Sequence, residues 1–566
     1  MELASLIDLL RGGGAFPDVD TLGGAQAVEV VETHASVVFL VGDRAWKMKK
    51  PVTFRFLDFS TLDRRRADCE AELRLNRRLL PEVYLGLAAV CRAGSAVRVV
   101  RLAEDGSAPA ATEIVEWMIE MRRLPAEGML DRLLATDQVR ADEIDRFAED
   151  LASFHASPAS AIDAEYGTDV GIIGGDARPE RAGDVATLRR RIDDNLTNLA
   201  RGASAGDDPV LTPSFVAALR AETLGWFDAI APELAARQRA GRVRDGHGDL
   251  HARNIVRLDG RLRAFDCLEF NAGYRRGDVA MEISFLAMDL EHAGRADLAE
   301  RFLRRYAEAS GDEACLRLSR FFRLHYAVVR AAVDALRLEQ TRGTPNTPDT
   351  PDKTNAMRSI RSSVQSYAAL AAGSLVAERS PRGVTLLLMG LPGTGKSTLA
   401  RLLARALRAS VIGSDTTRKG LVGLAPEDRG DQGLYDPAMS DATYAALARA
   451  MGDAEGPLVV DAGHRRRAQR ARTLAAAAAR DGSWLVIEVI TTPAIACERI
   501  RARRAQPTES DATERVYESE RAVFEPPDEV PADRHLVLRS DRPGWADDAH
   551  CAVLERLLKL CGRPVA

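Results

Sequence analysis

The sequence predicts an α+β domain followed by an α/β domain with a parallel sheet, and three observations support this. Residues 29–52 (EVVETHASVVFLVGDRAWKMKKPV) form two strand patterns joined by a Gly42-Asp43 turn, a strong hairpin signal. Beyond residue 383, short apolar runs (VTLLLM, PLVVDAG, SWLVIEVITT) alternate with long helical patterns, as in a parallel sheet. Between these regions lies the Thr- and Pro-rich segment 340–355, which predicts an exposed loop.

We place the main domain boundary at Ser380-Pro381, where the sequence changes character after a further helical pattern. The first domain then spans 1–380, with a small β-rich lobe over about 1–120 and a helical lobe over about 121–380. The second spans 381–566. Both are long enough to bury a core of their own.

Composition is that of a globular protein. The 566 residues are 46% hydrophobic and 28% charged, and the net charge of -5 gives no basic field that would attract nucleic acid or a membrane. The seven cysteines are scattered without a CxxC pair, which indicates reduced thiols and neither disulfides nor a zinc site. The N-terminus lacks a signal-peptide pattern and no apolar run is long enough to span a bilayer, so we expect a cytoplasmic protein.

The stretch GHGDLHARNI, residues 246–255, concentrates polar side chains that a core element would bury without partners. Phosphoryl transfer needs a carboxylate that accepts the proton of the acceptor hydroxyl, and a neutral oxygen ligand for Mg²⁺ a short way on. Asp249 and Asn254 fit these two roles. A second carboxylate for the metal, Asp266, follows 17 residues after Asp249, beyond a strand-like apolar segment.

These residues resemble the aminoglycoside phosphotransferase-like branch of the protein-kinase fold, whose HGDxHxxN signature stands here at His247–Asn254. The resemblance implies an ATP-dependent kinase with Asp249 as catalytic base and Asn254 and Asp266 as Mg²⁺ ligands. It further suggests that Asp278 braces the catalytic loop and that Glu269 assists the metal. A helix cap or a surface position remains an equal alternative for these last two.

The same resemblance places a phosphate-binding lysine and its glutamate partner upstream. Lys47 in RAWKMKKP is the expected lysine, with Lys49 on the same strand face as its rival. Glu72 shares a helix face with apolar residues, whereas Glu70 shares one with arginines, so Glu72 is the expected partner.

Two further segments of this lobe have a possible nucleotide contact. Residues 117–121 match a hinge strand that would meet adenine through its backbone, with a simple buried strand as the alternative. The turn at Thr33–Ser36 lacks the GxGxxG of protein kinases, so it must cover the phosphates differently or bind nucleotide more weakly.

A second phosphate site is predicted at GLPGTGKST, residues 390–398, which follows an apolar strand, opens a helix and satisfies GxxxxGK[ST]. In such a loop, backbone N–H groups and the helix dipole cradle the phosphates, Lys396 reaches the β- and γ-phosphates, and Ser397 ligates Mg²⁺. The residues expected to bind nucleotide are Gly390, Gly393, Thr394, Gly395, Lys396, Ser397 and Thr398.

Downstream, VIGSDTTRKG resembles the small P-loop kinases related to polynucleotide kinase and zeta-toxin kinases. That resemblance implies Asp415 as the base for the acceptor hydroxyl and Arg418 as a ligand of the phosphates; a helix-capping role is the alternative. Asp461 ends the next strand, where it would join the magnesium shell or the substrate.

Basic residues follow this strand, and two interpretations apply to them. His464 and Arg465–Arg467 would bind an anionic acceptor or merely start a helix. The segment CERIRARRAQPTESDATERV has the pattern of a lid, with Arg503 or Arg504 reaching ATP on closure.

Together the resemblances cover nearly the whole chain and imply a bifunctional, ATP- and Mg²⁺-dependent phosphotransferase. For the first site we expect small polar hydroxyl acceptors such as a sugar or amino alcohol, with an aminoglycoside drug less favoured. For the second, a small molecule or nucleotide sugar competes with a 5'-hydroxyl nucleic-acid end, which the acidic composition disfavours. The alternative from another class is that one domain, more readily the P-loop one, is a regulatory ATP-binding module. The sequence indicates no oligomeric state.

Overall fold

The computed structural model describes residues 2–12, 14–17, 28–54, 57–103, 113–162, 183–203, 208–342, 351–425, 428, 436–480, 482–503 and 512–561. The chain packs as two compact units. Unit 1 comprises Met1–Leu188 and Ile230–Phe322, and unit 2 comprises Arg189–Ala229 and Arg323–Ala566. The units therefore group several helices upstream of residue 380 with the C-terminal sheet, and the boundary at 380 remains a prediction.

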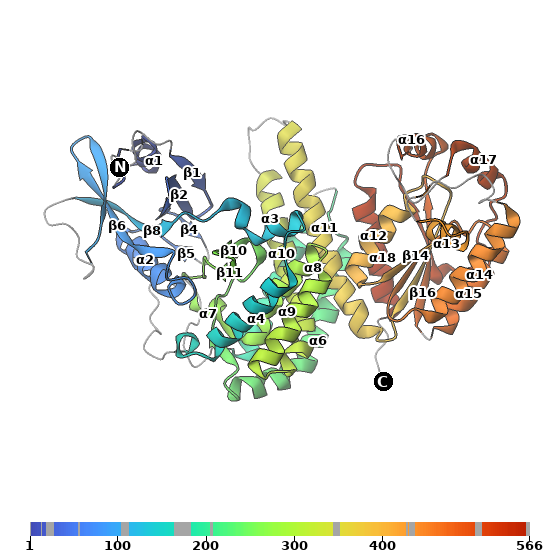
Figure 1. Ribbon diagram of the computed structural model, residues 1–566, viewed down its shortest axis with the longest axis horizontal. Helices are drawn as coiled ribbons and strands as arrows, with labels where there is room; N and C mark the ends of the chain where they lie inside the picture. The colour runs from blue at the N-terminus through green and yellow to red at the C-terminus, as the bar shows by residue number, and fades with distance from the viewer. Residues whose placement is uncertain are drawn as a thin grey trace. The chain divides into compact units, whose positions relative to one another are not determined.

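Unit 1 begins with a six-stranded antiparallel sheet in the order β1-β2-β3-β8-β6-β7 (Figure 1). The predicted hairpin is confirmed: β2 and β3 are antiparallel, with Val41 opposite Arg44 and Gly42 at a φ of 59° in the turn. A second turn at Thr33–Ala35 separates β1 from β2. The strands are β1 (Glu29–Glu32), β2 (Ser36–Val41), β3 (Arg44–Lys49), β6 (Tyr84–Ala93), β7 (Ala96–Arg101) and β8 (Ile114–Arg122), and a separate pair is formed by β4 (Thr53–Phe54) and β5 (Leu57–Asp58).

Helix α2 (Leu62–Asn76) lies against β6 and β8. Thr61 caps it by accepting a hydrogen bond from Arg64 N. The negative charge of Asp63 in the first turn interacts favourably with the positive end of the helix dipole. Its inner face packs Cys69 against Tyr84 and Trp117 in an apolar cluster. This packing fixes which α2 side chains face the sheet.

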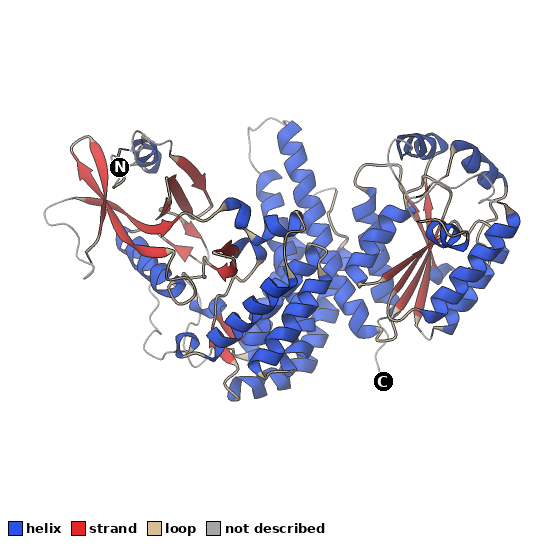
Figure 2. Cartoon of the chain, viewed as in Figure 1, coloured by secondary structure: helices blue, strands red, loops and turns tan. Residues whose placement is uncertain are grey.

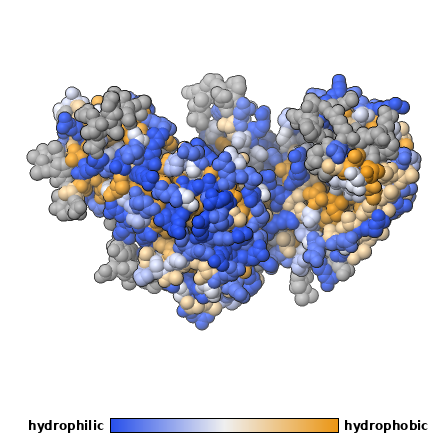
Figure 3. Space-filling view, in the orientation of Figure 1, coloured by the Kyte–Doolittle hydropathy of each residue, from blue (hydrophilic) through white to orange (hydrophobic). Residues whose placement is uncertain are grey.

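The rest of unit 1 is largely helical, with two small antiparallel strand pairs, β10 with β11 and β12 with β9. Hydrophilic residues gather on its surface over α4 and α9 (Figure 3), where Arg301 and Arg305 form ion pairs with Asp145 and Glu149. The elements are α1 (Leu3–Arg11), α3 (Leu130–Ala135), α4 (Ala141–Ala156), β9 (Val243–Asp245), β10 (Ile255–Leu258), β11 (Arg261–Ala264), α7 (Ala272–Arg275), β12 (Arg276–Asp278), α8 (Val279–His292) and α9 (Ala296–Ser310).

The chain passes between the units within three long helices, α5 (Val185–Ala203), α6 (Pro213–Arg239) and α10 (Ala314–Arg342). Helix α11 (Pro351–Arg379) follows, as the helical pattern there predicts. The loop expected over 340–355 is helical at both ends, because α10 continues to Arg342 and α11 starts at Pro351; the remainder of that prediction lies outside the described residues.

Unit 2 contains a five-stranded sheet in the order β14-β15-β13-β16-β17, and every strand pair in it is parallel (Figure 2). The predicted fold class, an α+β part followed by an α/β part with a parallel sheet, is therefore confirmed. The strands are β13 (Val384–Met389), β14 (Ser410–Gly413), β15 (Leu458–Asp461), β16 (Ser483–Ile490) and β17 (His535–Arg539), and the helices are α12 (Lys396–Leu407), α13 (Ser414–Leu421), α14 (Pro437–Asp453), α15 (Arg467–Ala479), α16 (Pro493–Arg503), α17 (Glu514–Ala522) and α18 (Trp545–Cys561).

Within unit 2, α11 packs closely on α12 and α18. A Cβ added to Gly373 of α11 would stand 2.0 Å from Ala406 O of α12, so only glycine permits this approach. Gln365 of α11 is buried and donates a hydrogen bond of 2.7 Å to Asp548 of α18. This contact explains why α11 belongs to the same unit as the sheet. Among the described residues, no helix has the length and apolar character needed to cross a bilayer.

Candidate active sites

The first candidate site is built around Lys47 of β3. Its ammonium lies 2.8 Å from Glu72 Oε1 of α2 and 2.7 Å from Asp266 Oδ1, which follows β11 by two residues. Glu72 is fully buried, whereas the Asp266 side chain is 42% exposed and so remains open to a ligand. Lys47 thus contacts both Glu72 and Asp266, and all three residues were candidates from the sequence.

Asp266 adopts a left-handed backbone conformation, with a φ of 60°. Its N–H donates a hydrogen bond of 3.0 Å to the Tyr84 hydroxyl, which holds this uncommon conformation. Burial acts to raise the pKa of Asp266, but the Lys47 ammonium outweighs it and the pKa falls to about 2. The carboxylate is therefore ionised at neutral pH, as a metal ligand must be.

The catalytic-loop motif lies beside Asp266 because β10 and β11 pair, with Ile255 opposite Ala264. Phe265 N donates to Asn254 O at 3.0 Å, and His247 Nε2 contacts Phe265 O at 2.8 Å. Asn254 Nδ2 donates to Asp249 Oδ2 at 3.0 Å. The structure therefore brings Asp249 and Asn254 together and joins their loop to the one that carries Asp266.

Glu282 of α8, which the sequence analysis did not identify, braces this loop. Its Oε2 accepts hydrogen bonds from His247 N at 2.8 Å and Gly248 N at 3.3 Å, and its Oε1 lies 3.0 Å from His155 Nε2. Asp278, the expected brace, instead caps α8 through Ala280 N. The alternative proposed for Asp278, a helix cap, is thus the one observed.

Asp278 also forms a buried ion pair with Arg237, at 2.7 Å, and Arg237 bonds Asp312 at the same distance. These contacts fasten the start of α8 to α6. The backbone of Asp278 also pairs with Val243 of β9, the strand that leads into the loop.

Replacing Glu282 by Ala should lower the stability of unit 1 by about 2–5 kcal/mol, since two backbone N–H groups and His155 would lose a buried charged partner. Thermal unfolding followed by circular dichroism measures this. Glu282→Gln is the matched control, because its amide oxygen still accepts from the loop. Equal midpoints for Glu282→Ala and the unchanged protein would show that the loop does not depend on this contact.

Lys49 and Glu269 form a separate buried group. Lys49 Nζ contacts Glu269 Oε1 and lies 2.8 Å from Asp68 Oδ2 and 2.6 Å from Glu72 Oε2. Lys47, not Lys49, therefore contacts Asp266. Glu269, considered as an aid to the metal, is engaged with the second lysine.

The strand expected to meet adenine is a central strand of the sheet. Within β8, Met118 and Ile119 face Met48 and Lys47 on one side and Ala88 and Leu87 on the other. Its backbone is thus paired along both edges, which favours the alternative of a simple buried strand. The turn at Thr33–Ser36 is tight: Ser36 N donates to Thr33 Oγ1 at 3.0 Å, and Lys50 Nζ donates to Thr33 O at 2.8 Å.

The second candidate site is the loop between β13 and α12. Gly390, Gly393 and Gly395 all have positive φ, at 136°, 78° and 97°. A Cβ on Gly390 would lie 2.4 Å from Val489 O, and one on Gly393 would lie 2.5 Å from Ala496 O. Only glycine fits these positions, and the loop ends with Lys396, Ser397 and Thr398 at the N-terminus of α12. Lys396 Nζ donates to Leu391 O at 3.0 Å.

Acidic residues converge on this loop because β13, β14 and β15 are parallel neighbours and end together, with Asp461 opposite both Leu388 and Gly413. Burial raises the pKa of Asp461, while Lys396 and a hydrogen bond from Ser397 act to lower it. Burial lowers the pKa of Lys396, and the carboxylates of Asp461 and Asp415 oppose that shift. Asp415 thus lies within electrostatic reach of the P-loop lysine.

Asp415 is in the first turn of α13, whose N-cap is Gly413, so it does not cap the helix. Its Oδ1 accepts a hydrogen bond of 2.6 Å from Arg418, which is buried. The two residues of the D-x-x-R motif thus form an ion pair within α13, and their roles as base and phosphate ligand remain predictions.

Two of the basic residues noted downstream have structural contacts. His464 is buried, with its N–H donating to the Tyr444 hydroxyl at 2.7 Å and its Nδ1 2.8 Å from Leu388 O. Arg465 forms an ion pair with Glu520. The charge of Arg465 nevertheless acts on the pKa of Lys396, so it too lies near the P-loop.

Arg503 is the last residue of α16, and its charge acts on the pKa of both Lys396 and Asp461, so it lies near the P-loop. Arg504 lies outside the described residues. Arg499, which the sequence analysis did not identify, braces the P-loop: it bonds Ser540 O at 2.6 Å, and Ser540 Oγ donates to Thr394 O at 2.7 Å. Arg499 and Arg503 are spaced i, i+4 and so share a face of α16, and this spacing could have indicated from the sequence that Arg499 lies on the same side as Arg503.

Both sites have the chemistry that a Mg²⁺–nucleotide complex requires. In unit 1, Asp266 is an ionised carboxylate, and Asn254, whose backbone oxygen accepts a hydrogen bond from Phe265 N, carries a side-chain amide oxygen; both are hard oxygen ligands. In unit 2, the glycine positions leave the backbone room that any Cβ would fill, and Ser397 adjoins Asp461. The donor sets therefore fit the group.

Residues 386–527 match a family described as "AAA domain". The protein named "Uncharacterized protein Rv2004c" of Mycobacterium tuberculosis is 32% identical over 446 residues, which cover 77% of each chain. The structure of an aminoglycoside phosphotransferase from Alicyclobacillus acidocaldarius is 12% identical and covers 61% of this chain and 92% of its own, with a TM-score of 0.32. A gluconokinase from Sinorhizobium meliloti is 18% identical and covers 32% of this chain and 97% of its own, with a TM-score of 0.23.

Proposed function

The chain belongs to the family of the mycobacterial protein Rv2004c, and we propose from its own two sites that it is an ATP- and Mg²⁺-dependent phosphotransferase. Each site would transfer the γ-phosphoryl group of ATP to a hydroxyl acceptor. The observation that carries the proposal is the contact of Lys47 with both Glu72 and Asp266, beside the Asp249–Asn254 pair. In this arrangement Lys47 would serve as phosphate ligand, Asp266 as metal ligand and Asp249 as base.

At the first site, Lys47 would hold the phosphates while Glu72 keeps its ammonium oriented. Asn254 and Asp266 would hold Mg²⁺, which neutralises charge on the phosphates. Asp249, whose side chain is 40% exposed, would accept the proton of the acceptor hydroxyl. As the acceptor oxygen bonds to the γ-phosphorus, the bond from that phosphorus to the bridging oxygen breaks, and ADP leaves with that electron pair.

At the second site, the N–H groups of the P-loop and Lys396 would bind the phosphates, and Ser397 and Asp461 would complete the metal shell. Asp415 would accept the acceptor proton, oriented by Arg418 at 2.6 Å. Arg503 would add positive charge where the transferring group develops negative charge. The proximity of Asp415 to Lys396 favours this reading over a purely regulatory P-loop unit.

The acceptors that we propose are small polar hydroxyl compounds, such as sugars or amino alcohols at the first site. A 5'-hydroxyl nucleic-acid end is the second candidate at the P-loop site, supported by the proximity of Arg465 and Arg503 to Lys396. The net charge of -5 favours the small molecule.

ATP consumption across a panel of hydroxyl compounds, including a 5'-hydroxyl oligonucleotide, tests the proposal in the full chain. Asp249→Asn should abolish turnover with one group of acceptors, and Lys396→Ala should abolish turnover with another. The double variant should show neither. Loss of both activities in either single variant would refute two independent sites, and unchanged ATP consumption in both would refute the catalytic assignment.

A further inference from the structure

Strand β3 carries a second lysine whose charge is completely enclosed. Lys49 is 2% exposed, and its ammonium is in contact with the carboxylates of Asp68, Glu72 and Glu269. We call these four residues the Lys49 cluster. Asp68 and Glu72 are on α2, and Glu269 follows Asp266 by three residues. The cluster therefore connects the sheet, the helix and the metal-binding loop.

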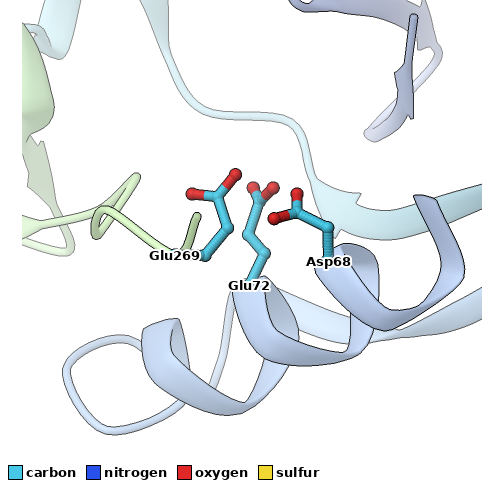
Figure 4. Close-up of side chains that lie close together, drawn as sticks. All are labelled: Asp68, Glu72 and Glu269. Atoms are coloured by element: carbon cyan, nitrogen blue, oxygen red, sulfur yellow. The ribbon is translucent and has the colours of Figure 1, made fainter. Parts of the chain in front are cut away.

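The three carboxylates converge from opposite sides, each with an oxygen within 4.8 Å of the others (Figure 4). That spacing would suit a metal ion. The Lys49 ammonium contacts all three, so the cation that they hold is already part of the chain. Burial raises the pKa of Glu269 to about 8 and also raises that of Asp68, to which Glu269 is hydrogen bonded.

Glu72 links the cluster to the catalytic residues. Its Oε2 lies 2.6 Å from Lys49, while its Oε1 lies 2.8 Å from Lys47, which in turn lies 2.7 Å from Asp266 Oδ1. The loop from Asp266 to Glu269 then leads back to Lys49. The contacts form a closed ring in which each lysine bridges α2 and the metal-binding loop.

The two lysines differ in what a nucleotide would do to them. Incoming phosphates would compete with Glu72 and Asp266 for Lys47, because all of these groups are anionic. Only 2% of the Lys49 side chain is exposed, so incoming phosphates would not reach its ammonium. Its hold on α2 and on the loop would persist while Lys47 engages the nucleotide.

We propose that Lys49 is a positioning residue that holds Glu72 and the Asp266 loop in their nucleotide-binding arrangement before ATP arrives. This inference rests on the phosphotransferase function proposed for the same site. Lys49 itself touches no substrate. Its loss should leave Lys47, Asp249 and Asp266 present but no longer prearranged.

The test uses the full chain in a Lys396→Ala background, which silences the P-loop site. Hydrogen exchange without nucleotide compares residues 66–76 and 264–270 in the background and in Lys49→Met. We expect faster exchange in both segments together, because they share one partner. Steady-state kinetics should show a rise in KM for ATP of about 10- to 100-fold, with kcat lowered much less, since ATP can rebuild the arrangement at a cost to binding.

Glu269→Gln keeps the shape of the cluster, so it tests the role of Lys49 if Lys49→Met does not fold. It should also raise the exchange rates and the KM for ATP, but by a smaller amount. Glu70→Gln, on the exposed face of α2, is the control and should change neither. Unchanged exchange at 264–270, or a fall in kcat at constant KM, overturns the inference. If the background protein itself consumes no ATP, the proposed function fails, while the exchange experiment still decides the role of Lys49.

Discussion

Replacing Asp266 by Asn should reduce turnover at the first site by about 1000-fold, since several kcal/mol of charge stabilisation depend on the metal that this carboxylate would hold. Asn also tolerates the left-handed backbone, at a φ of 60°, so the loop should keep its conformation. Lys47 would retain Glu72 as its partner. The change therefore removes the negative charge of Asp266 and leaves the loop conformation and the Lys47–Glu72 pair in place.

The measurement is ATP consumption with a first-site acceptor as a function of Mg²⁺ concentration. Asp259→Asn is a matched control, because Asp259 also has a positive φ, 50°, but lies in the exposed turn between β10 and β11. It should behave as the unchanged protein. Activity of Asp266→Asn within threefold of the unchanged protein, at every Mg²⁺ concentration, would show that Asp266 does not bind the catalytic metal.

Replacing Asp415 by Asn should lower kcat at the P-loop site by about 100- to 10,000-fold, the range that a positioned base contributes. ATP affinity should change little, because Lys396 and the loop backbone are untouched. Arg418 would keep a hydrogen-bond acceptor in the new amide. Loss of turnover with intact binding would separate an acceptor-side base from a phosphate ligand.

Nucleotide titration and ATP consumption with a second-site acceptor, both in an Asp249→Asn background, provide the measurement. Asp441→Asn serves as the control, since Asp441 is an exposed aspartate on the neighbouring helix α14. If Asp415→Asn turns over ATP as fast as the control, the P-loop unit is better described as a nucleotide-binding regulator than as a kinase.

The sequence determined those features of the protein that local sequence patterns encode. The hairpin of β2 and β3 followed from alternating apolar residues around Gly42, and the P-loop from glycines between a strand and a helix. Glu72 was separable from Glu70 because a helix repeats every 3.6 residues, which puts only one of them on the apolar face. In each case the deciding neighbours lie within a few positions.

Tertiary structure alone decided which distant groups meet. Asp278 and Glu282 lie one turn apart on the same end of α8, and only packing shows that Glu282 reaches the catalytic loop. Likewise, only the tertiary structure shows that β8 is paired with β3 on one edge and with β6 on the other. The grouping of α11 with the C-terminal sheet, through Gly373 and Gln365, was equally hidden.

The physical reason is the range of each interaction. Helix periodicity, turn geometry and capping act between residues close in the chain, so the amino-acid sequence by itself determined the hairpin, the P-loop and the identity of Lys47, Asp249 and Lys396 as candidates. Ion pairs such as Lys49 with Glu269 join residues 220 positions apart, and their formation depends on burial that the whole fold creates. The ring of charges around Glu72 was therefore decided only by the tertiary structure.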